Sequence, residues 1–259
     1  MSAVVPAGRA LAAVREANAR LAPISLEEVL RAAELQTRVD RKYLVSPDAF
    51  TALMDGVAAE HRVLQIDSLR DFRYESVYFD TPELTSYHLA ARGRRNKFKV
   101  RTRTYLDSDT CMLEVKSVGR RNQTVKERMD YATPDRTRLS PKAAKFVEAR
   151  VVLPDGAGSL APVLTTTYAR ATLVDPLHGS RMTCDTDLRL VDRFGGDAQM
   201  TDRVLVETKS AGAPLAADRI LWRLGVRPLR LSKYCVGMAR LDPALPSNRW
   251  HRTLRRHFH

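Results

Sequence analysis

Polar and apolar side chains alternate through the centre of the chain, in the stretch 97–105. The odd positions carry Lys97, Lys99, Arg101 and Arg103, and the even positions carry apolar or hydroxyl side chains. A period of two is typical of a β-strand, in which successive side chains point to opposite faces. The apolar face is expected to pack on the core, so the four cations must face water or an anion. Like charges on one face repel one another, and folding alone does not explain them.

A second alternating stretch, Cys111–Lys116, follows the segment 106–110, whose Asp and Ser residues favour a turn. The two stretches predict an antiparallel hairpin with Glu114 and Lys116 together on one face. For an isolated hairpin, a solvated sheet face with cross-strand ion pairs explains this pattern equally well. Repetition of the pattern along the chain favours a function for the charges.

The same pattern recurs in further segments. Strands with charges on one face are expected at 37–45, 73–80, 123–131, 164–173, 180–190 and 203–209, and the segment 227–234 is again basic. Helices are expected at 25–34, 46–60, 84–91, 140–150 and 214–225, from capping residues and from Pro in a first turn.

About eight strands with unlike faces predict an α+β fold built on a closed antiparallel eight-stranded β-barrel with surrounding helices, because closure removes exposed strand edges. If the charged faces point inward, they line a cationic tunnel with a few carboxylates. Such a tunnel would be a site for a linear polyphosphate. The domain is expected at 34–241, between an N-terminal helical extension at 1–33 and a basic tail at 242–259 that we expect to be disordered.

The charge balance points to a polyanionic partner. The 259 residues include 43 Lys and Arg against 30 Asp and Glu, a formal net charge of +13. Nucleic acid, a phosphate-rich metabolite and an anionic membrane all fit this charge. Nucleic acid fits least well, because the basic residues alternate along strands and lack a recognition helix or interleaved exposed aromatics.

Several other classes of protein are disfavoured. Cys111, Cys184 and Cys235 lie far apart without a Cys-x-x-Cys spacing, which argues against a zinc site and a disulfide framework and for a reducing compartment. No apolar run approaches the roughly 18 residues of a membrane span, and arginines interrupt the Ala-rich N-terminus, unlike a secretory signal. We therefore expect a soluble cytoplasmic protein. The sequence has no Gly-rich phosphate loop, no Ser/His/Asp arrangement and no histidine cluster.

Nine short motifs, in their order and spacing, resemble one known family. They are Arg38–Tyr43, Ser76–Thr81, Val100–Tyr105, Leu113–Lys116, Lys126–Arg128, Tyr168–Arg170, Arg181–Asp187, Val206–Lys209 and Leu231–Tyr234. Over roughly 34–241 the chain resembles the CYTH-like triphosphate tunnel metalloenzymes, and among them the VTC-type polyphosphate polymerase domain. Members of this type look like transferases that add the γ-phosphate of ATP to a growing polyphosphate chain inside the tunnel.

The resemblance implies roles for individual residues. By position, the residues that would hold phosphoryl oxygens during catalysis are Lys42, Arg101, Arg103, Lys116, Arg170, Arg181 and Lys233. Further substrate-binding candidates are Lys99, Lys126, Arg128, Lys209, Arg230 and Ser232. Glu207 would be the metal ligand, with Mn²⁺ or Mg²⁺ as the ion. ATP and inorganic polyphosphate would be the partners, and a separate membrane protein is a further candidate, while the oligomeric state stays open.

The first strand departs from the wider superfamily. That superfamily often begins with Glu-x-Glu-x-Lys, which supplies metal-binding carboxylates, whereas this chain has Arg38-x-Asp40-x-Lys42. The difference favours the VTC branch over adenylate cyclases and thiamine triphosphatases, and it leaves no clear metal ligand on the first strand.

Other interpretations of the carboxylates and of the function stay open. Glu207 could instead pair with Lys209, Glu114 could pair with Lys116 or orient a base, and Asp185 or Asp187 could pair with Arg181. A metal-dependent hydrolase of triphosphate, polyphosphate or nucleoside triphosphate would use the same cations as a polymerase. A non-catalytic polyphosphate-binding module would need the cations but no metal.

Overall fold

The structure is a computed structural model, and it describes residues 8–32, 39–119 and 123–258. Arg38, which begins the first motif, lies outside these residues. The strands are β1 (Pro23–Ile24), β2 (Val39–Val45), β3 (Arg62–Leu64), β4 (Phe72–Asp80), β5 (Lys99–Tyr105), β6 (Thr110–Val118), β7 (Thr124–Tyr131), β8 (Ala161–Asp175), β9 (Ser180–Asp192), β10 (Asp197–Met200) and β11 (Val204–Ser210). The helices are α1 (Arg9–Ala19), α2 (Leu26–Ala32), α3 (Pro47–Val57), α4 (Thr85–Ala91), α5 (Pro141–Glu148), α6 (Ala216–Arg223), α7 (Lys233–Leu241) and α8 (His251–His257).

One sheet of eleven strands contains all of these strands, and eight of them follow the path β2-β11-β9-β8-β4-β5-β6-β7. Strands β1, β3 and β10 pair outside this path. The expected α+β class with a large antiparallel sheet is confirmed, and each predicted strand from 37–45 to 203–209 has its counterpart. The closed barrel is not confirmed, because within the described part of the chain no pairing joins β2 to β7, the two ends of the path. The sheet is also not purely antiparallel, since β1 pairs with β3 in parallel.

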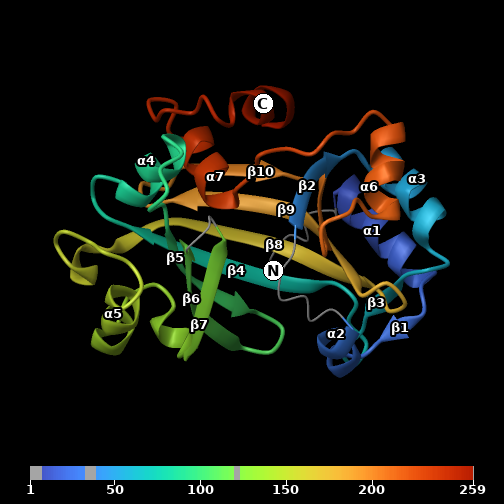
Figure 1. Ribbon diagram of the computed structural model, residues 1–259, viewed down its shortest axis with the longest axis horizontal. Coiled ribbons are helices and arrows are strands. Elements are labelled where there is room, and N and C mark those ends of the chain that lie inside the picture. Colours follow the sequence, from blue (N-terminus) through green and yellow to red (C-terminus); the bar gives the residue numbers. More distant parts are fainter. Residues whose placement is uncertain (1–7, 33–38, 120–122, 259) are drawn as a thin grey trace, which may run out of the picture. The chain divides into compact units, whose positions relative to one another are not determined.

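The chain folds into two compact units. The first comprises Met1–Phe72, Tyr168–Leu188 and Gln199–Arg230. Its core lies between one face of β2, β9 and β11 and the helices α1, α3 and α6 (Figure 1). Helix α3 begins at a predicted cap, because the Ser46 hydroxyl accepts a hydrogen bond from the Ala49 N–H at 3.3 Å. Alternation along β2 directs Tyr43 and Val45 into this core, so Lys42 lies on the opposite face of the strand.

The second unit comprises Arg73–Thr167, Arg189–Ala198 and Leu231–His259. Its core joins the apolar face of β4, β5 and β6 to α5 (Figure 1). Val100, Leu113 and Val115 are fully or almost fully buried there. The alternation seen in the sequence therefore places the cations of β5 on the face away from this core.

Two segments near the C-terminus contain helices. In the basic segment 227–234, Ser232 caps α7 with its hydroxyl, and Lys233 is the first residue of that helix. In the tail for which disorder is predicted, residues 251–257 form α8, and Trp250 is only 5% exposed. The described part of the chain contains no helix with the length and hydropathy of a membrane span.

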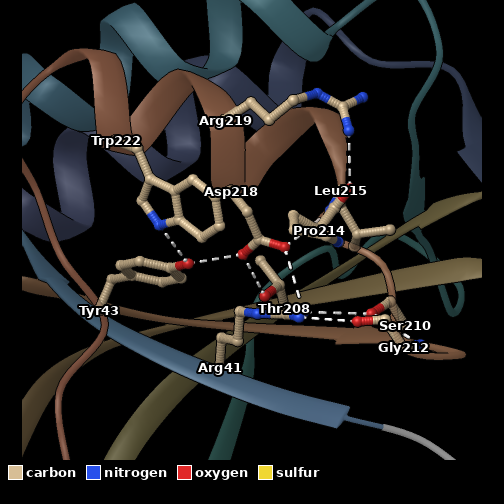
Figure 2. Close-up of polar contacts among 10 residues, drawn as sticks. All are labelled: Arg41, Tyr43, Thr208, Ser210, Gly212, Pro214, Leu215, Asp218, Arg219 and Trp222. Atoms are coloured by element: carbon tan, nitrogen blue, oxygen red, sulfur yellow. Dashed lines mark hydrogen bonds and ion pairs between the residues drawn. The ribbon is translucent and has the colours of Figure 1, made fainter.

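A buried carboxylate ties α6 to the two strands that carry Lys42 and Glu207. Asp218 on α6 is fully buried and accepts hydrogen bonds of 2.7 Å from the hydroxyls of Tyr43 and Thr208. It also accepts one of 2.7 Å from the Leu215 N–H, and the Arg41 guanidinium lies 3.5 Å away (Figure 2). Arg41 in turn donates to the Gly212 carbonyl at 2.7 Å. These contacts lock β2, β11 and the loop before α6 to one another.

We expect Asp218→Ala to lower the free energy of unfolding by about 3–5 kcal/mol, because it leaves the largely buried Arg41 guanidinium without its counter-ion and two buried hydroxyls without their acceptor. Tyr43→Phe removes one hydroxyl and should cost about 1 kcal/mol. The measurement is urea unfolding, with Asp202→Ala as the control because its exposed carboxylate pairs with the partly exposed Arg203. Stability of Asp218→Ala within about 1 kcal/mol of the wild type would contradict this interpretation.

Candidate functional site

In the first unit, charged side chains gather on the sheet face opposite the helices. Glu207 on β11 lies directly across from Lys42 on β2 and from Thr183 on β9. Its carboxylate is 2.6 Å from the Lys209 ammonium and 3.7 Å from the Lys42 ammonium. We call Lys42, Glu207, Lys209, Arg170 and Asp185 the Glu207 cluster.

Arginines extend this cluster onto the neighbouring strands. Arg170 on β8 binds Asp185 on β9 through two hydrogen bonds of 2.5 and 2.8 Å. Arg181 lies opposite Lys209 in the pairing of β9 with β11. Asp185 therefore pairs with Arg170. The same sheet face carries all the predicted cations of this unit's strands, namely Lys42, Arg170, Arg181 and Lys209.

The electrostatics of the cluster keep its carboxylate ionised. Burial acts to raise the pKa of Glu207, but the Lys209 and Lys42 ammoniums and the Arg170 guanidinium together hold that pKa well below its usual range. Burial lowers the pKa of Lys209 to about 8, against the attraction of Glu207. The ion pair with Lys209 was the alternative that the sequence left open for Glu207, and the structure contains it.

In the second unit, a carboxylate is again surrounded by cations. Glu114 on β6 lies opposite Arg101 on β5, and its carboxylate oxygen accepts a hydrogen bond of 2.8 Å from Arg101. Lys126 on β7 forms a close ion pair with Glu114, and Arg103 lies 3.9 Å from it. Glu114 is only 2% exposed, while the three cations around it are partly accessible. We call Arg101, Arg103, Glu114 and Lys126 the Glu114 cluster.

More cations share the face of the Glu114 cluster. In the strand register, Lys99 lies opposite Lys116, Lys116 opposite Lys126, and Glu114 opposite Arg128. Directly paired residues of antiparallel strands have their side chains on the same face. The face of β5, β6 and β7 therefore carries six cations, namely Lys99, Arg101, Arg103, Lys116, Lys126 and Arg128. The cations of β5, which have no acidic neighbour within their own strand, thus have a counter-ion in Glu114 on β6. The cations on this face still outnumber the carboxylates.

Burial and charge shift the pKa values of this cluster in opposite directions. Burial acts to raise the pKa of Glu114, but Arg101, Arg103 and Lys126 lower it far below its usual range. Burial lowers the pKa of Lys126 to about 8, with the attraction of Glu114 acting against this shift and the two arginines adding to it. Glu114 is thus an anion at neutral pH, and its charge offsets only part of the positive charge around it.

Aromatic residues orient Arg101, a contact that the sequence did not reveal. The Arg101 guanidinium donates a hydrogen bond of 3.1 Å to the Tyr78 hydroxyl, and the Tyr78 ring stacks on Tyr234 with ring centres 5.2 Å apart. The Tyr234 hydroxyl donates to the fully buried Asp80 at 2.5 Å. Tyr78 itself is only 4% exposed. Its position opposite Arg101 in the pairing of β4 with β5 is the signal that could have identified it.

Three predicted phosphate-binding residues lie outside the strands. Ser232 accepts a hydrogen bond of 3.3 Å from the Cys235 N–H as the cap of α7, so its hydroxyl already serves the helix. Lys233 is half-buried at the first position of that helix. In the other unit, Arg230 is exposed in the segment that follows α6.

A buried polar atom beside the Glu207 cluster and another within the Glu114 cluster lack a hydrogen-bond partner among the described residues. The Thr183 hydroxyl, opposite Glu207, and the Arg103 Nε atom have no hydrogen-bond partner among the described residues. Buried donors without acceptors are costly unless a ligand or water satisfies them. Phosphoryl oxygens match donors of this kind, and arginine binds them well.

The residues around Glu207 fit a divalent ion only if the substrate completes its coordination. No group of three or more His, Cys, Asp or Glu side chains converges in the described parts of the chain. Glu207 supplies one ionised, hard oxygen ligand, which suits Mg²⁺ or Mn²⁺ together with phosphate oxygens and water. The Lys209 ammonium, 2.6 Å from this carboxylate, would have to move toward the substrate phosphates when the ion binds.

Comparisons with known proteins found one family model and several solved structures similar to this chain. The family model described as VTC domain matches residues 37–242. One similar solved structure is that of a Hippeastrum protein proposed as an adenylyl cyclase and found to have a dominant triphosphatase activity. Its TM-score is 0.52 and its sequence identity 15%, and the match covers 78% of this chain and 96% of that chain. A structure from Vibrio parahaemolyticus, assigned as an adenylate cyclase, has a TM-score of 0.44 and 16% identity, covering 77% of this chain and 96% of that chain. No curated protein matches the chain.

We expect Glu114→Gln to lower the free energy of unfolding by roughly 2–3 kcal/mol, because three cations would lose their shared counter-ion. Urea unfolding measures this loss. The control is Glu127→Gln on the other face of β7, where the half-exposed carboxylate pairs with Arg150 and the expected loss is below about 1 kcal/mol. Equal losses in the two variants would contradict a central role of Glu114.

The lowered pKa of Lys126 predicts a pH dependence. Between pH 8 and the ordinary lysine pKa, the unfolded state binds a proton that the folded state has released, so this group makes the free energy of unfolding rise with pH. Lys126→Met should remove that contribution, so the stability of the wild type relative to the variant should increase from pH 7.5 to pH 9.5. The same comparison with Lys142→Met, an exposed lysine of α5, should show no such change. A constant difference between the wild type and Lys126→Met would disprove the shift.

Proposed function

The chain belongs to the VTC domain family, and from this premise we propose that it is an ATP-dependent polyphosphate polymerase. It would transfer the γ-phosphate of ATP to a growing polyphosphate chain, using Mn²⁺ or Mg²⁺. The observation that carries the proposal is the excess of cations on one sheet face within each unit, gathered around a single ionised carboxylate. A cationic tunnel, as implied by the family resemblance, remains part of the proposal.

The side chains of the two clusters have the properties that phosphoryl transfer requires. The transferred phosphoryl group carries charge on several oxygens, so catalysis depends mainly on positioning and on electrostatic stabilisation. Arg101 and Arg103 would bind these oxygens with their planar guanidinium groups, and Tyr78 would hold Arg101 in orientation. Lys116, Lys126, Arg170 and Arg181 would neutralise neighbouring phosphates.

Glu207 would hold the divalent ion, which would supply positive charge to stabilise the charge that develops on phosphoryl oxygens and on the leaving group. Lys42 and Lys209 would then exchange their contact with Glu207 for phosphate oxygens. Because Lys209 is nearly buried and lies 2.6 Å from the carboxylate, the pair keeps both charges in place until substrate arrives. The half-buried Lys233 would contribute one more cation.

A second candidate is hydrolysis of triphosphate or polyphosphate. The fold is shared with the Hippeastrum protein of dominant triphosphatase activity, and the same cations would serve either reaction. The reactions differ in the acceptor of the phosphoryl group, which is a phosphate chain in one and water in the other. A binding module without turnover is the third candidate.

Turnover of ATP tests the proposal directly. Purified protein is incubated with ATP and Mn²⁺, and ADP, free phosphate and polyphosphate are followed together. Matched formation of ADP and polyphosphate is the expected result. ADP with free phosphate would make the protein a hydrolase, and neither product, with tight tripolyphosphate binding, would make it a binding module.

The variant Glu207→Gln tests the role of the carboxylate. We expect polymer formation to fall by about two orders of magnitude or more, because the metal ligand is lost while the cations remain. Metal-free affinity for tripolyphosphate should be retained or increased, because Lys42 and Lys209 lose their internal counter-ion. Glu127→Gln is the matched control, because its carboxylate pairs with Arg150 on the face of β7 opposite the cations. Undiminished polymer formation in Glu207→Gln would rule out Glu207 as the metal ligand.

A further inference from the structure

The second unit carries a basic surface outside the Glu114 cluster. It consists of exposed side chains from the loop between α4 and β5 and from the C-terminal segment. They are Arg92, Arg94, Arg95, Lys97, Arg249, Arg252, Arg255 and Arg256. We call these eight residues the outer basic surface.

Packing against α4 brings the two segments together. The Tyr87 hydroxyl of α4 donates a hydrogen bond of 3.1 Å to the Pro246 carbonyl, and the Tyr87 ring lies 5.7 Å from that of the buried Trp250. Trp250 directly precedes α8, which also contacts α7 near the chain end marked C in Figure 1. On the loop side, the Arg249 guanidinium lies against Gly93, so close that a Cβ atom there would collide with it. A fixed contact therefore joins the loop to the segment before α8.

The charges of this surface are not balanced within the fold. In the chain as described, no carboxylate forms a salt bridge with any of the eight residues, although salt bridges occur at many other arginines. Exposed like charges do not stabilise the folded state, and they repel one another at low ionic strength. The buried Trp250 and Tyr87 nevertheless hold them in one place.

The types of side chain in the outer basic surface disfavour two classes of polyanionic ligand, namely membranes and single-stranded nucleic acid. None of the large hydrophobic side chains that are exposed in the described residues comes from segments 91–98 or 249–258. Insertion into a membrane needs apolar side chains beside the cations, and binding of single-stranded nucleic acid needs exposed aromatic platforms. Seven of the eight cations are arginines, which bind phosphoryl oxygens with a planar pair of donors.

We propose that the outer basic surface is a second binding site for inorganic polyphosphate. This surface would bind one part of a long polyphosphate chain while another part of the same chain binds the cations proposed to act in catalysis. The inference rests on the proposed function, because it requires a long phosphate chain as acceptor or product. Two weak contacts on one flexible chain act together through effective concentration, so a long chain should bind more tightly than a short one. Tripolyphosphate is too short to benefit.

The test compares binding of tripolyphosphate and of long-chain polyphosphate by isothermal titration calorimetry, without ATP. The variant Arg94→Ala/Arg95→Ala/Arg255→Ala/Arg256→Ala neutralises the surface from both segments. We expect its affinity for long-chain polyphosphate to fall by roughly tenfold or more, and the slope of log affinity against log salt to decrease by about three. Affinity for tripolyphosphate should not change. The matched control is Arg62→Ala/Lys142→Ala/Lys145→Ala/Arg223→Ala, which removes four exposed cations elsewhere and should bind both ligands nearly as the wild type does.

Each other result has a separate meaning. If the wild type binds tripolyphosphate but the surface variant binds long chains as tightly as the control does, the outer site does not exist and the proposed function is unaffected. If the wild type binds neither ligand, the proposed function itself fails. If the surface variant keeps long-chain binding and instead loses binding to phosphatidylserine vesicles, the surface serves a membrane and the proposal is overturned.

Discussion

The structure depends on a buried carboxylate that offsets part of the charge of a row of cations on the same sheet face. Glu114 does this for Arg101, Arg103 and Lys126 in one unit, and Glu207 does it for Lys42 and Lys209 in the other. In each unit the carboxylate lies in mid-strand, directly opposite a cation on the neighbouring strand. Without the carboxylates, the closely spaced like charges would oppose folding. Because they balance only part of the charge, both faces remain strongly attractive to phosphoryl groups.

The opposite faces of the same strands supply the rigidity that such sites need. Tyr43 and Thr208 point toward α6 and meet Asp218, so the strands that carry Lys42 and Glu207 cannot slip relative to each other (Figure 2). In the second unit, Asp80 holds Tyr234, and Tyr234 supports the Tyr78 that orients Arg101. Precise placement of charges before the substrate arrives is the main contribution a protein can make to phosphoryl transfer. Under the proposed function, these buried polar networks would hold the cations in place before the substrate binds.

Much of this architecture could be predicted from local patterns. Alternation predicted the hairpin of β5 and β6 and the charged faces of β2, β9 and β11, and the caps Ser46 and Ser140 predicted α3 and α5. Contacts between distant residues could not be predicted in this way. The partner of Glu114 depends on the exact register across a turn, and Tyr43 and Asp218 are separated by 175 positions.

Crystals grown with tripolyphosphate and Mn²⁺ would test the central claim most directly, because the anomalous signal of manganese locates the ion independently of the phosphates. The account predicts a manganese peak beside the Glu207 carboxylate, with the Lys209 ammonium moved from Glu207 to a phosphate oxygen. It also predicts phosphate density on cations of the two clusters. Manganese bound away from Glu207, or tripolyphosphate bound away from both clusters, would contradict the account.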